Sequence, residues 1–276
     1  MNKNEVISLL KELGFKPNKK LGQNFLIDNN IINQKIIPAL ELSASRKILE
    51  IGPGLGALTK ILLEESKELT LIEIDKGFAN YLKNKFPSRP NLKIIQQDFL
   101  KVSVGDRYEK IVSNLPYYCA SEIIFKLATE YQQAKDIFLT IQKEMAERII
   151  ALPNQKMYGA LTVNLNFYFE PKILFIIKKK SFYPEPEVDS AFIKLSRRKK
   201  LLLPLFQRTL FHKVVKALFW GRRKTILTSL ANSPHLEISK NQIIKKLDKI
   251  NLDHKLRAEN LTLKNFIDIT QEISHE

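Results

Sequence analysis

Residues 50–57 (EIGPGLGA) join a short apolar run at residues 47–51 to a segment, residues 55–65, whose apolar side chains recur at helical spacing. This is the pattern of a β-strand that passes through a glycine turn into a helix. Glycines in such a turn let the backbone approach a ligand closely at the N-terminus of the helix. Because ordinary strand–helix turns also contain glycine, the turn alone does not distinguish a ligand site from a structural turn.

The segments after the glycine turn continue the alternation of strand and helix. Helical spacing predicts helices at residues 76–86, 120–130 and 144–152. Apolar runs predict strands at residues 69–74, 92–96, 110–113 and 137–141. Two late strands at residues 172–178 and 191–195 are compatible with an antiparallel hairpin. Residues 158–169 fit a helix by length and a strand by their aromatics. We therefore expect an α/β fold with a mostly parallel sheet covered on both faces.

The pattern changes after residue 200. From Pro204 onward the apolar residues show helical spacing only, with no convincing strand. We place a domain boundary near Leu201. This predicts a first domain over residues 1–200 and a small all-α domain over residues 201–276.

Positive charge is the most marked feature of the composition. The chain has 276 residues with 45 Lys and Arg against 29 Asp and Glu, a formal net charge of +16. Residues 197–276 contain 17 basic and 7 acidic residues, so less than a third of the chain holds most of the excess. Clustered cations bind the phosphates of a polyanion. A solvated lysine-rich surface gives the same pattern, and an anionic membrane surface is a third option.

The sequence excludes several classes of protein. Its single cysteine, Cys119, rules out an internal disulfide framework and a cysteine-based zinc site, and four scattered histidines favour no metal site. No apolar run approaches the roughly 18 residues of a membrane span. The first residues include the acids Glu5 and Glu12 and no small-residue cleavage site, so we interpret them as mature protein in the cytoplasm. With no oligomerisation signal, we expect a monomer.

Two acidic residues end the strands next to the glycine turn. Glu73 lies 21 residues after Gly52, the spacing at which a carboxylate accepts the hydroxyl hydrogens of a ribose. Asp98 ends the following strand, so it can reach the same edge of the sheet and contact the adenine of a nucleoside ligand bound there. The pattern favours a nucleoside-type cofactor. Because Gly52-x-Gly54-x-x-Ala57 also fits the dinucleotide fingerprint, both S-adenosylmethionine and NAD stay open here, although no hydride partner stands out.

Residues 113–118 (SNLPYY) follow the fourth strand at the same edge of the sheet. Asn and Pro are turn formers, and the tyrosines would also suit a core. The position equally suits methylation of an exocyclic adenine amine, whose lone pair is delocalised into the ring. Acceptors at the Asn114 side chain and a backbone carbonyl of Leu115 or Pro116 would draw that nitrogen toward tetrahedral geometry, with Pro116 fixing the carbonyl direction. Tyr117 offers a face on which an extruded base can stack.

Six short segments extend this pattern along most of the chain. They are residues 20–26 (KLGQNFL), 50–56 (EIGPGLG), 114–117 (NLPY), 142–144 (QKE), 182–190 (FYPEPEVDS) and 219–225 (FWGRRKT). With these segments in this order, residues 16–232 resemble the ribosomal RNA adenine N6,N6-dimethyltransferases, and most of all the bacterial small-subunit branch of that family.

The resemblance implies a Rossmann-like class I methyltransferase fold with a mostly parallel, seven-stranded sheet. It implies transfer of methyl groups from S-adenosylmethionine to N6 of two adjacent adenines in the 3′-terminal hairpin of small-subunit (16S) rRNA. The products would be N6,N6-dimethyladenosines made during late 30S assembly. The implied partner is small-subunit rRNA or the immature 30S subunit, with neither a metal nor a membrane.

By motif, the resemblance assigns site residues to three groups. The cofactor group is Asn24, Leu26, Gly52, Gly54, Glu73, Asp98 and Asn114. The group around the reactive amine is Asn114, Leu115, Pro116, Tyr117 and, as a second aromatic face for the base, Phe182. The group that contacts rRNA phosphates is Arg222, Arg223 and Lys224. For Phe182 the alternative is a loop aromatic that plugs the end of the sheet.

Two departures and two alternatives accompany the resemblance. Glu187 stands where the family often has a basic residue, which puts an RNA contact of that loop in doubt, and Thr228 stands where it often has Asn. One alternative is a large-subunit rRNA dimethyltransferase of the macrolide-resistance type, against which residues 142–144 and 222–225 argue. The other is a non-catalytic assembly factor on the same fold, against which the intact turn at residues 114–117 argues.

Overall fold

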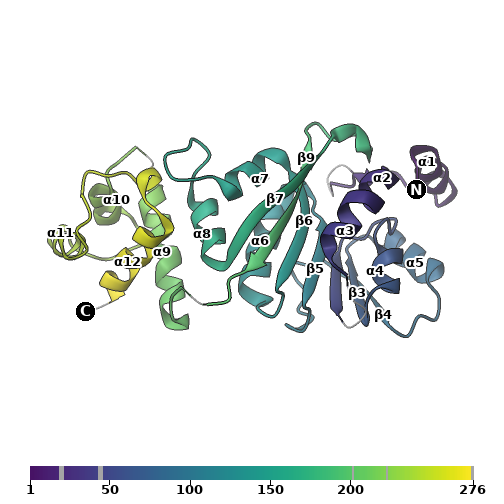
Figure 1. Cartoon of the computed structure of the whole chain (residues 1–276), viewed down its shortest axis with the longest axis horizontal. Helices are drawn as coiled ribbons and strands as arrows, with labels where there is room; N and C mark the ends of the chain where they lie inside the picture. The colour runs from purple at the N-terminus through teal and green to yellow at the C-terminus, as the bar shows by residue number, and fades with distance from the viewer. Residues whose placement is uncertain (19–21, 43–45, 201, 222, 275–276) are drawn as a thin grey trace. The chain divides into compact units, whose positions relative to one another are not determined.

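The computed structural model describes the chain except for residues 19–21, 43–45, 201, 222 and 275–276 (Figure 1). It divides into two compact units. The first comprises Met1–Ala146 and Pro171–Arg197, and the second comprises Glu147–Glu170 and Arg198–Glu276. The segment 147–170 is tied to the C-terminal helices by long-range hydrogen bonds, such as Tyr158 Oη to the Leu261 carbonyl at 2.7 Å. The compact units are thus interleaved along the chain, and a functional division at residues 200/201 stays a prediction.

A seven-stranded sheet in the order β4-β3-β2-β5-β6-β9-β7 positions the site. Its strands are β2 (Lys47–Ile51), β3 (Glu68–Glu73), β4 (Leu92–Gln96), β5 (Lys110–Asn114), β6 (Asp136–Gln142), β7 (Phe169–Ile177) and β9 (Ser190–Arg197). The pairs β2–β3, β2–β5, β3–β4 and β5–β6 are parallel, and β9 runs antiparallel to β6. The predicted α/β fold with a mostly parallel, seven-stranded sheet is confirmed. The two late strands, β7 and β9, are neighbours at one edge.

Helices cover both faces of this sheet, which is why its central strands are continuous apolar runs. On one face lie α4 (Thr59–Glu64), α5 (Lys76–Lys85) and a continuous segment made of α2 (Asn29–Ile31), the π-helical turn η2 (Ile32–Ile36) and α3 (Ile37–Leu40). Their apolar side chains share one buried cluster with Leu69, Leu71 and Val112 of the strands. Figure 1 shows α6 (Ala120–Glu130) on the opposite side of the sheet, and its apolar stripe is buried.

The N-terminal segment adds two elements that the sequence did not predict. β1 (Phe25–Leu26) pairs antiparallel with β8 (Phe182–Tyr183), with Leu26 opposite Phe182. α1 (Lys3–Glu12) is capped at its N-terminus by Asn2, which forms a capping box with Glu5. Strands of two residues have no periodicity to detect, so only the tertiary structure reveals that the segments QNFL and FYPEPEVDS meet.

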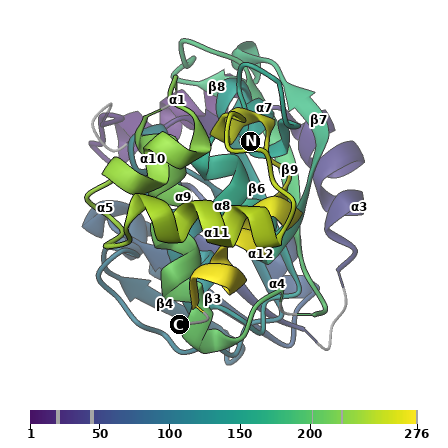
Figure 2. The same ribbon diagram turned by 90° about the vertical axis from the view of Figure 1, so that its left-hand side faces the viewer.

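The second unit is mainly helical, and its described residues after Pro204 form helices and turns without a named strand. Its helices are α8 (Ala160–Tyr168), α9 (Arg208–Trp220), α10 (Ile226–Asn232), α11 (Lys240–Lys249) and α12 (Leu263–Ser274), with the second half of α7 (Lys143–Ile150). Figure 2 looks onto α9 to α12. Stacked rings join α8 to α9 (Phe167 and Phe211, centroids 4.2 Å apart) and α9 to α12 (Phe219 and Phe266, 5.7 Å). The ambiguous residues 158–169 are thus mostly helix, with β7 beginning at Phe169.

Short 3₁₀ turns complete the described elements: η3 (Tyr117–Cys119), η4 (Lys179–Ser181), η5 (Leu205–Gln207) and η6 (Ala258–Asn260). In the described ranges, we find neither a helix with the length and apolar character to cross a membrane nor a group of three or more His, Cys, Asp or Glu side chains placed to hold a metal ion. Cys119 is a buried free thiol.

Candidate active site

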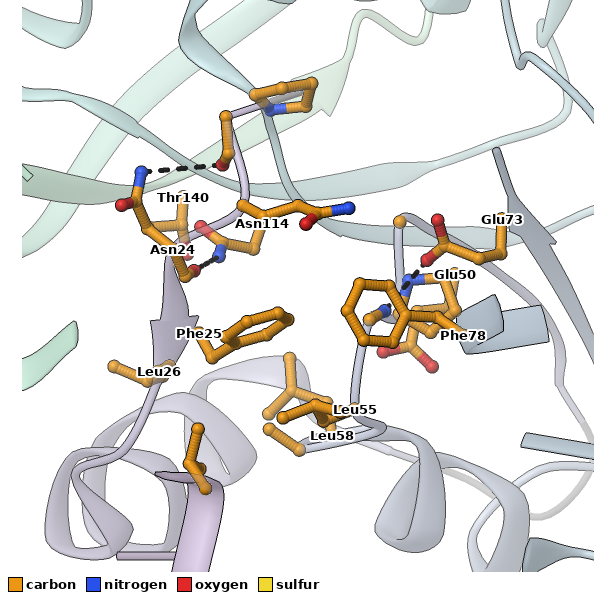
Figure 3. A pocket seen from close by; sticks show the side chains of 18 of the residues that line it. Asn24, Phe25, Leu26, Glu50, Leu55, Leu58, Glu73, Phe78, Asn114 and Thr140 are labelled. Atoms are coloured by element: carbon orange, nitrogen blue, oxygen red, sulfur yellow. Dashed lines mark hydrogen bonds between the residues drawn. The ribbon is translucent and has the colours of Figure 1, made fainter. Parts of the chain in front are cut away.

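A pocket in the first unit opens at the carboxyl ends of the parallel strands (Figure 3). This edge is where ligands bind in open α/β sheets, because the loops after successive strands converge there. The glycine turn after β2, Glu73 of β3, Asn114 of β5 and Thr140 of β6 all line it. The predicted site residues that line the pocket are Asn24, Leu26, Gly52, Gly54, Glu73, Asn114 and Pro116.

The glycine turn and Glu73 are held together by hydrogen bonds. Gly54 N–H donates to Glu73 Oε2 at 3.0 Å, and Asp75 N–H donates to Oε1 at 2.9 Å. Gly54 has φ +55°, which favours glycine, and an added Cβ would lie 3.1 Å from the Phe25 ring, so that ring would have to shift slightly. Each Glu73 oxygen keeps a second acceptor site.

Two buried carboxyl groups, Glu50 and Glu73, lie in this pocket. Burial raises the pKa of Glu50 to about 8; the hydrogen bond from Thr59 Oγ1 (2.7 Å) opposes this shift, and the charge of Glu73 adds to it. Burial also raises the pKa of Glu73, against the hydrogen bonds from Asp75 and Gly54. Glu50 is therefore mostly protonated at neutral pH, which limits the negative charge in the pocket.

Aromatic and leucine side chains form the apolar wall of the pocket. Phe25 and Phe78 meet edge to face with ring centroids 5.4 Å apart, and Leu55 lies beside them (Figure 3). Val6 of α1 packs on the same cluster. Sequence reasoning missed these residues. Phe78 had a detectable signal, because it lies in the first turn of the helix that follows Glu73, and Phe25 had one in the segment KLGQNFL. Val6 had none.

Asn114 is tied to the N-terminal segment. Its Nδ2 donates to the backbone carbonyl of Asn24 at 2.9 Å, and Figure 3 shows both side chains at one side of the pocket. An amide whose nitrogen is engaged in this way has its orientation assigned by the bond, because the carbonyl of Asn24 can only accept. Oδ1 is therefore the end of the Asn114 amide that can accept a hydrogen from a ligand.

The turn after Asn114 is fixed by two further contacts. Leu115 N–H donates to the Thr140 carbonyl at 3.0 Å, and the Leu115 side chain is buried away from the pocket lining. Gly22 packs against Pro116: its φ is +61°, and an added Cβ would lie 2.9 Å from Pro116 Cβ. Only glycine fits there, which gives a physical reason for the glycine of the KLGQNFL segment.

Tyr117 is held by a residue that the sequence reasoning did not assign. Its hydroxyl lies 2.9 Å from the hydroxyl of the fully buried Ser190. Burial raises the pKa of Tyr117, so the phenol stays protonated and takes part in this hydrogen bond. Ser190 closes the segment FYPEPEVDS and begins β9, so the bond links that segment to the NLPY turn.

Like Leu115 and Tyr117, the predicted site residues Asp98 and Phe182 lie outside the pocket lining. Asp98 does not line the pocket; its Oδ1 accepts from Leu100 N–H at 2.9 Å, as in an ordinary turn. Phe182 is 3% exposed and belongs to the cluster under the sheet, where its pairing with Leu26 in the β1–β8 sheet holds it. Phe182 is thus buried in this structure, and both its contact with a base and the alternative of a plugging aromatic stay predictions.

The predicted RNA-contact residues belong to the second unit. Arg223 and Lys224 are exposed, and Arg222 lies outside the described residues. Two other basic residues, Arg197 and Lys178, are engaged within the protein. Arg197 donates to four backbone carbonyls, among them Ala134 and Tyr131, and Lys178 pairs with Asp189 at 2.9 Å. The polyanion interpretation therefore does not hold for Arg197, which is a structural residue.

The lining suits S-adenosylmethionine. A nucleoside needs an apolar wall for its base and a hydroxyl acceptor for its ribose, and Phe78, Leu55 and Glu73 provide these. The methionine end of this cofactor carries an ammonium and a carboxylate group and needs no phosphate cradle. Glu50 and Gly52 both line the pocket, and a Cβ at Gly52 would lie 3.9 Å from the Asn114 carbonyl, so the glycine turn leaves room there for a ligand.

Comparisons with known proteins agree with this chemistry. A model of the family "Ribosomal RNA adenine dimethylase" matches residues 14–275. A ribosomal RNA small subunit methyltransferase A from Listeria innocua is 38% identical over 269 residues, covering 94% of this chain and 91% of that protein. The protein of the same name from Clostridium botulinum is 40% identical over 271 residues, covering 96% of each.

Solved structures show the same relationship in three dimensions. A dimethyladenosine transferase from Plasmodium falciparum aligns with a TM-score of 0.81 at 26% identity, covering 91% of this chain and 98% of that one. The 23S rRNA methyltransferase ErmE aligns with a TM-score of 0.68 at 25% identity, covering 91% and 100%. The chain therefore belongs to the ribosomal RNA adenine dimethylase family, enzymes that transfer methyl groups from S-adenosylmethionine to adenines of ribosomal RNA.

Proposed function

We propose that this rRNA adenine dimethyltransferase modifies N6 of two adjacent adenines in the 3′-terminal hairpin of small-subunit rRNA, during late assembly of the 30S subunit. The relatives whose names specify the small subunit are 37–40% identical to the chain, whereas the 23S rRNA methyltransferase ErmE is 25% identical. This difference supports the small-subunit substrate over the large-subunit alternative.

The orientation of the Asn114 amide is the observation that carries the proposal. With Nδ2 engaged by the Asn24 carbonyl, Oδ1 is the acceptor for one hydrogen of the adenine amine. A carbonyl of Leu115 or Pro116 accepts the second hydrogen, in a turn that Gly22 and Thr140 fix. Two acceptors localise the lone pair on the nitrogen, and the rigid turn holds it in line for methyl transfer.

Tyr117 is the aromatic that we propose for stacking on the target base. Its ring is partly exposed and its hydroxyl is anchored to Ser190, so the ring plane is fixed before the base arrives. Stacking an extruded base on a preset aromatic face offsets part of the cost of unstacking it from the RNA. Phe182 would contact the base only if β8 moved, since its ring is buried.

We assign the pocket to S-adenosylmethionine, with Glu73 as the ribose acceptor and Asn24, Leu26, Gly52, Gly54 and Asn114 around the ligand. The cofactor supplies an activated methyl group. Within this site the protein binds and orients, and the apolar wall of Phe25, Leu55 and Phe78 excludes water. We keep Asp98 as a proposed contact of the cofactor adenine, although Asp98 does not line the pocket in this structure. Glu73→Gln should weaken cofactor binding in calorimetry, because an amide oxygen offers fewer acceptor sites than a carboxylate.

We propose that the residues after 200 form the rRNA-binding domain. Arg223 and Lys224 are exposed cations, and with Arg222 they would contact phosphates. We further expect the protein to act as a monomer in the cytoplasm, where immature small subunits are its partners. Sedimentation of the purified protein checks the first expectation, since a dimer would contradict it.

The test is methyl transfer to small and large subunits isolated from a strain that lacks these modifications. We expect tritiated methyl incorporation into small subunits only, mapped to two adjacent dimethyladenosines in the 3′-terminal hairpin. Incorporation into large-subunit rRNA alone would establish the macrolide-resistance type instead. Binding to small subunits without any incorporation would point to an assembly factor.

A further inference from the structure

One face of α9 is an exposed stripe of basic and aromatic residues. Thr209, Lys213, Lys216 and Trp220 are exposed and follow one another at intervals of four, three and four residues, which places them on one side of the helix. The opposite side is buried in the second unit through Phe211, Val214, Val215, Ala217 and Leu218. The stripe is therefore a solvent-facing surface of a firmly packed helix.

Trp220 ends this stripe and is unusual for a surface position. Its side chain is 48% exposed, although a large aromatic ring is normally buried. Lys224 Nζ lies 4.7 Å from the ring centroid. Gly221 makes this possible, because a Cβ there would lie 2.9 Å from Lys224 Cδ. The indole is thus presented to solvent beside a cation that is folded back against it.

The charges along the stripe lack acidic partners. Within the described residues, no carboxylate lies within ion-pair distance of Lys213 or Lys216. Both lysines line a surface hollow, and Glu237 lines it too without pairing with either of them. α9 itself contains no acidic residue. The charge of Lys216 also helps to lower the pKa of the neighbouring His212 to about 4, after burial as the larger cause. By contrast, Lys178 and Arg197 are satisfied within the protein.

We propose that the stripe Lys213–Lys216–Trp220 binds an unpaired stretch of ribosomal RNA. Lys213 and Lys216 contact successive phosphates, and one base stacks on the exposed indole of Trp220 beside Lys224. The identity of this partner rests on the proposed function, in which rRNA is the substrate. The site itself is separate from the pocket that Asn114 lines. The proposal gives the second unit a contact with an RNA base. The motif Arg222-Arg223-Lys224 by itself provides only charge for phosphates.

Unpaired RNA fits this surface better than other polyanions do. Cations along a backbone track combined with an aromatic platform are the two features with which proteins bind single strands. Paired RNA hides its base faces, so it could use the lysines but not the indole. From Lys213 to Trp220 the stripe spans eight residues, or about 10 Å of helix, which matches a local contact rather than a long channel.

The test uses Trp220 itself, because it is the single tryptophan of the chain. The full-length protein is titrated with a short unpaired RNA of mixed sequence while tryptophan emission is recorded, and binding is followed independently by anisotropy of a labelled copy. We expect emission to be quenched with the same midpoint as the anisotropy change. Binding without quenching would overturn the stacking contact.

Substitutions then measure the contribution of the indole. Trp220→Ala should weaken binding of the unpaired RNA by about 5- to 150-fold, the range for losing one stacked base, while Trp220→Phe restores most of it. Phe206→Ala is the matched control, because Phe206 is a still more exposed aromatic outside the stripe, at 78%. Equal losses in the Trp220 and Phe206 variants would overturn the proposal. Circular dichroism melting confirms that each variant is folded.

The lysines are tested by salt dependence. Lys213→Ala and Lys216→Ala should each reduce the slope of log affinity against log salt by about one, whereas Lys240→Ala, at an exposed position on α11, should not. Unchanged slopes would overturn the phosphate contacts. A shift of Trp220 emission with phosphatidylglycerol vesicles but not with RNA would overturn the choice of partner and assign the stripe to a membrane surface.

The outcomes separate this site from the proposed function. If methyl transfer maps to the small subunit while Trp220→Ala binds RNA normally, the stripe fails and the function stands. If transfer maps elsewhere while quenching and the loss in Trp220→Ala persist, the stripe remains an RNA site and the substrate assignment fails.

Discussion

Asn114 Nδ2 donates to the backbone carbonyl of Asn24 at 2.9 Å, a bond between the end of β5 and a segment 90 residues earlier in the chain. The bond makes the two ends of the Asn114 amide unequal. Its nitrogen holds the N-terminal segment in place, and its oxygen is left to accept from a ligand. One side chain thus joins the construction of the pocket to the recognition of the target amine.

Asn114→Ala should reduce methyl transfer to unmethylated small subunits by about 10²- to 10³-fold, the usual cost of removing one preorganised group at a reacting centre. Cofactor binding should change far less, because the apolar wall and Glu73 remain. Single-turnover transfer and calorimetry measure the two effects. Asn84→Ala, the same change at an exposed position on α5, is the control. Turnover within tenfold of the wild type would reject the amine contact.

The hydrogen bond between Tyr117 and Ser190 should position the base-stacking ring. Tyr117→Phe and Ser190→Ala should each lower turnover by about fivefold, equivalent to one neutral hydrogen bond, with little effect on cofactor affinity. Because both changes remove the same bond, the double variant should be scarcely worse than either single one. Tyr118→Phe removes a hydroxyl from the adjacent, exposed tyrosine and should have little effect. Fully additive losses would show that the two hydroxyls act independently.

Gly22 and Gly105 allow steric clash to be separated from backbone strain. Both have positive φ, +61° and +79°, but an added Cβ meets Pro116 at 2.9 Å in the first case and nothing within 4 Å in the second. Gly105→Ala should cost about 1–3 kcal/mol of stability from strain alone. Gly22→Ala should cost more and should also lower methyl transfer, because Pro116 must move. Urea unfolding and transfer assays measure both, and equal losses would contradict the contact.

The free energy of unfolding should fall as pH rises through the range between the unfolded-state and folded-state pKa values of Glu50. Its pKa is raised from 4.5 in the absence of burial to about 8 in the folded protein, so the folded state binds its proton more tightly than the unfolded state does. The contribution is fully present below about pH 4.5 and is lost as pH rises through about 8. Its largest slope is about 1.4 kcal/mol per pH unit.

Glu50→Gln tests this linkage, because glutamine resembles the protonated carboxyl and still accepts from Thr59. Free energies of unfolding from urea titrations at pH 5, 7 and 9 should decline less with pH in the variant than in the wild type. Glu64→Gln makes the same change at an exposed position on α4 and should leave the decline as it is. Parallel curves for Glu50→Gln and the wild type would contradict the raised pKa.

The sequence by itself determined the sheet, the glycine turn and the family. Apolar periodicity identified the parallel strands from β2 to β6, because a strand buried on both faces must be continuously apolar. Glycines with positive φ marked the turn, and their spacing to Glu73 placed the acid at the carboxyl edge, since parallel strands end together. These are local signals, because each depends on residues within one strand, one turn or one helix.

The tertiary structure alone decided how separate segments complete the site. It placed Phe182 in the core and Asp98 outside the pocket lining, paired Tyr117 with Ser190, and showed that Arg197 is a structural cation. It also brought β1 against β8 and so put Asn24 beside Asn114. The physical reason is that such contacts are single hydrogen bonds or two-residue pairings between distant segments. They have no period along the chain, and only the packing of the whole unit specifies which partners meet.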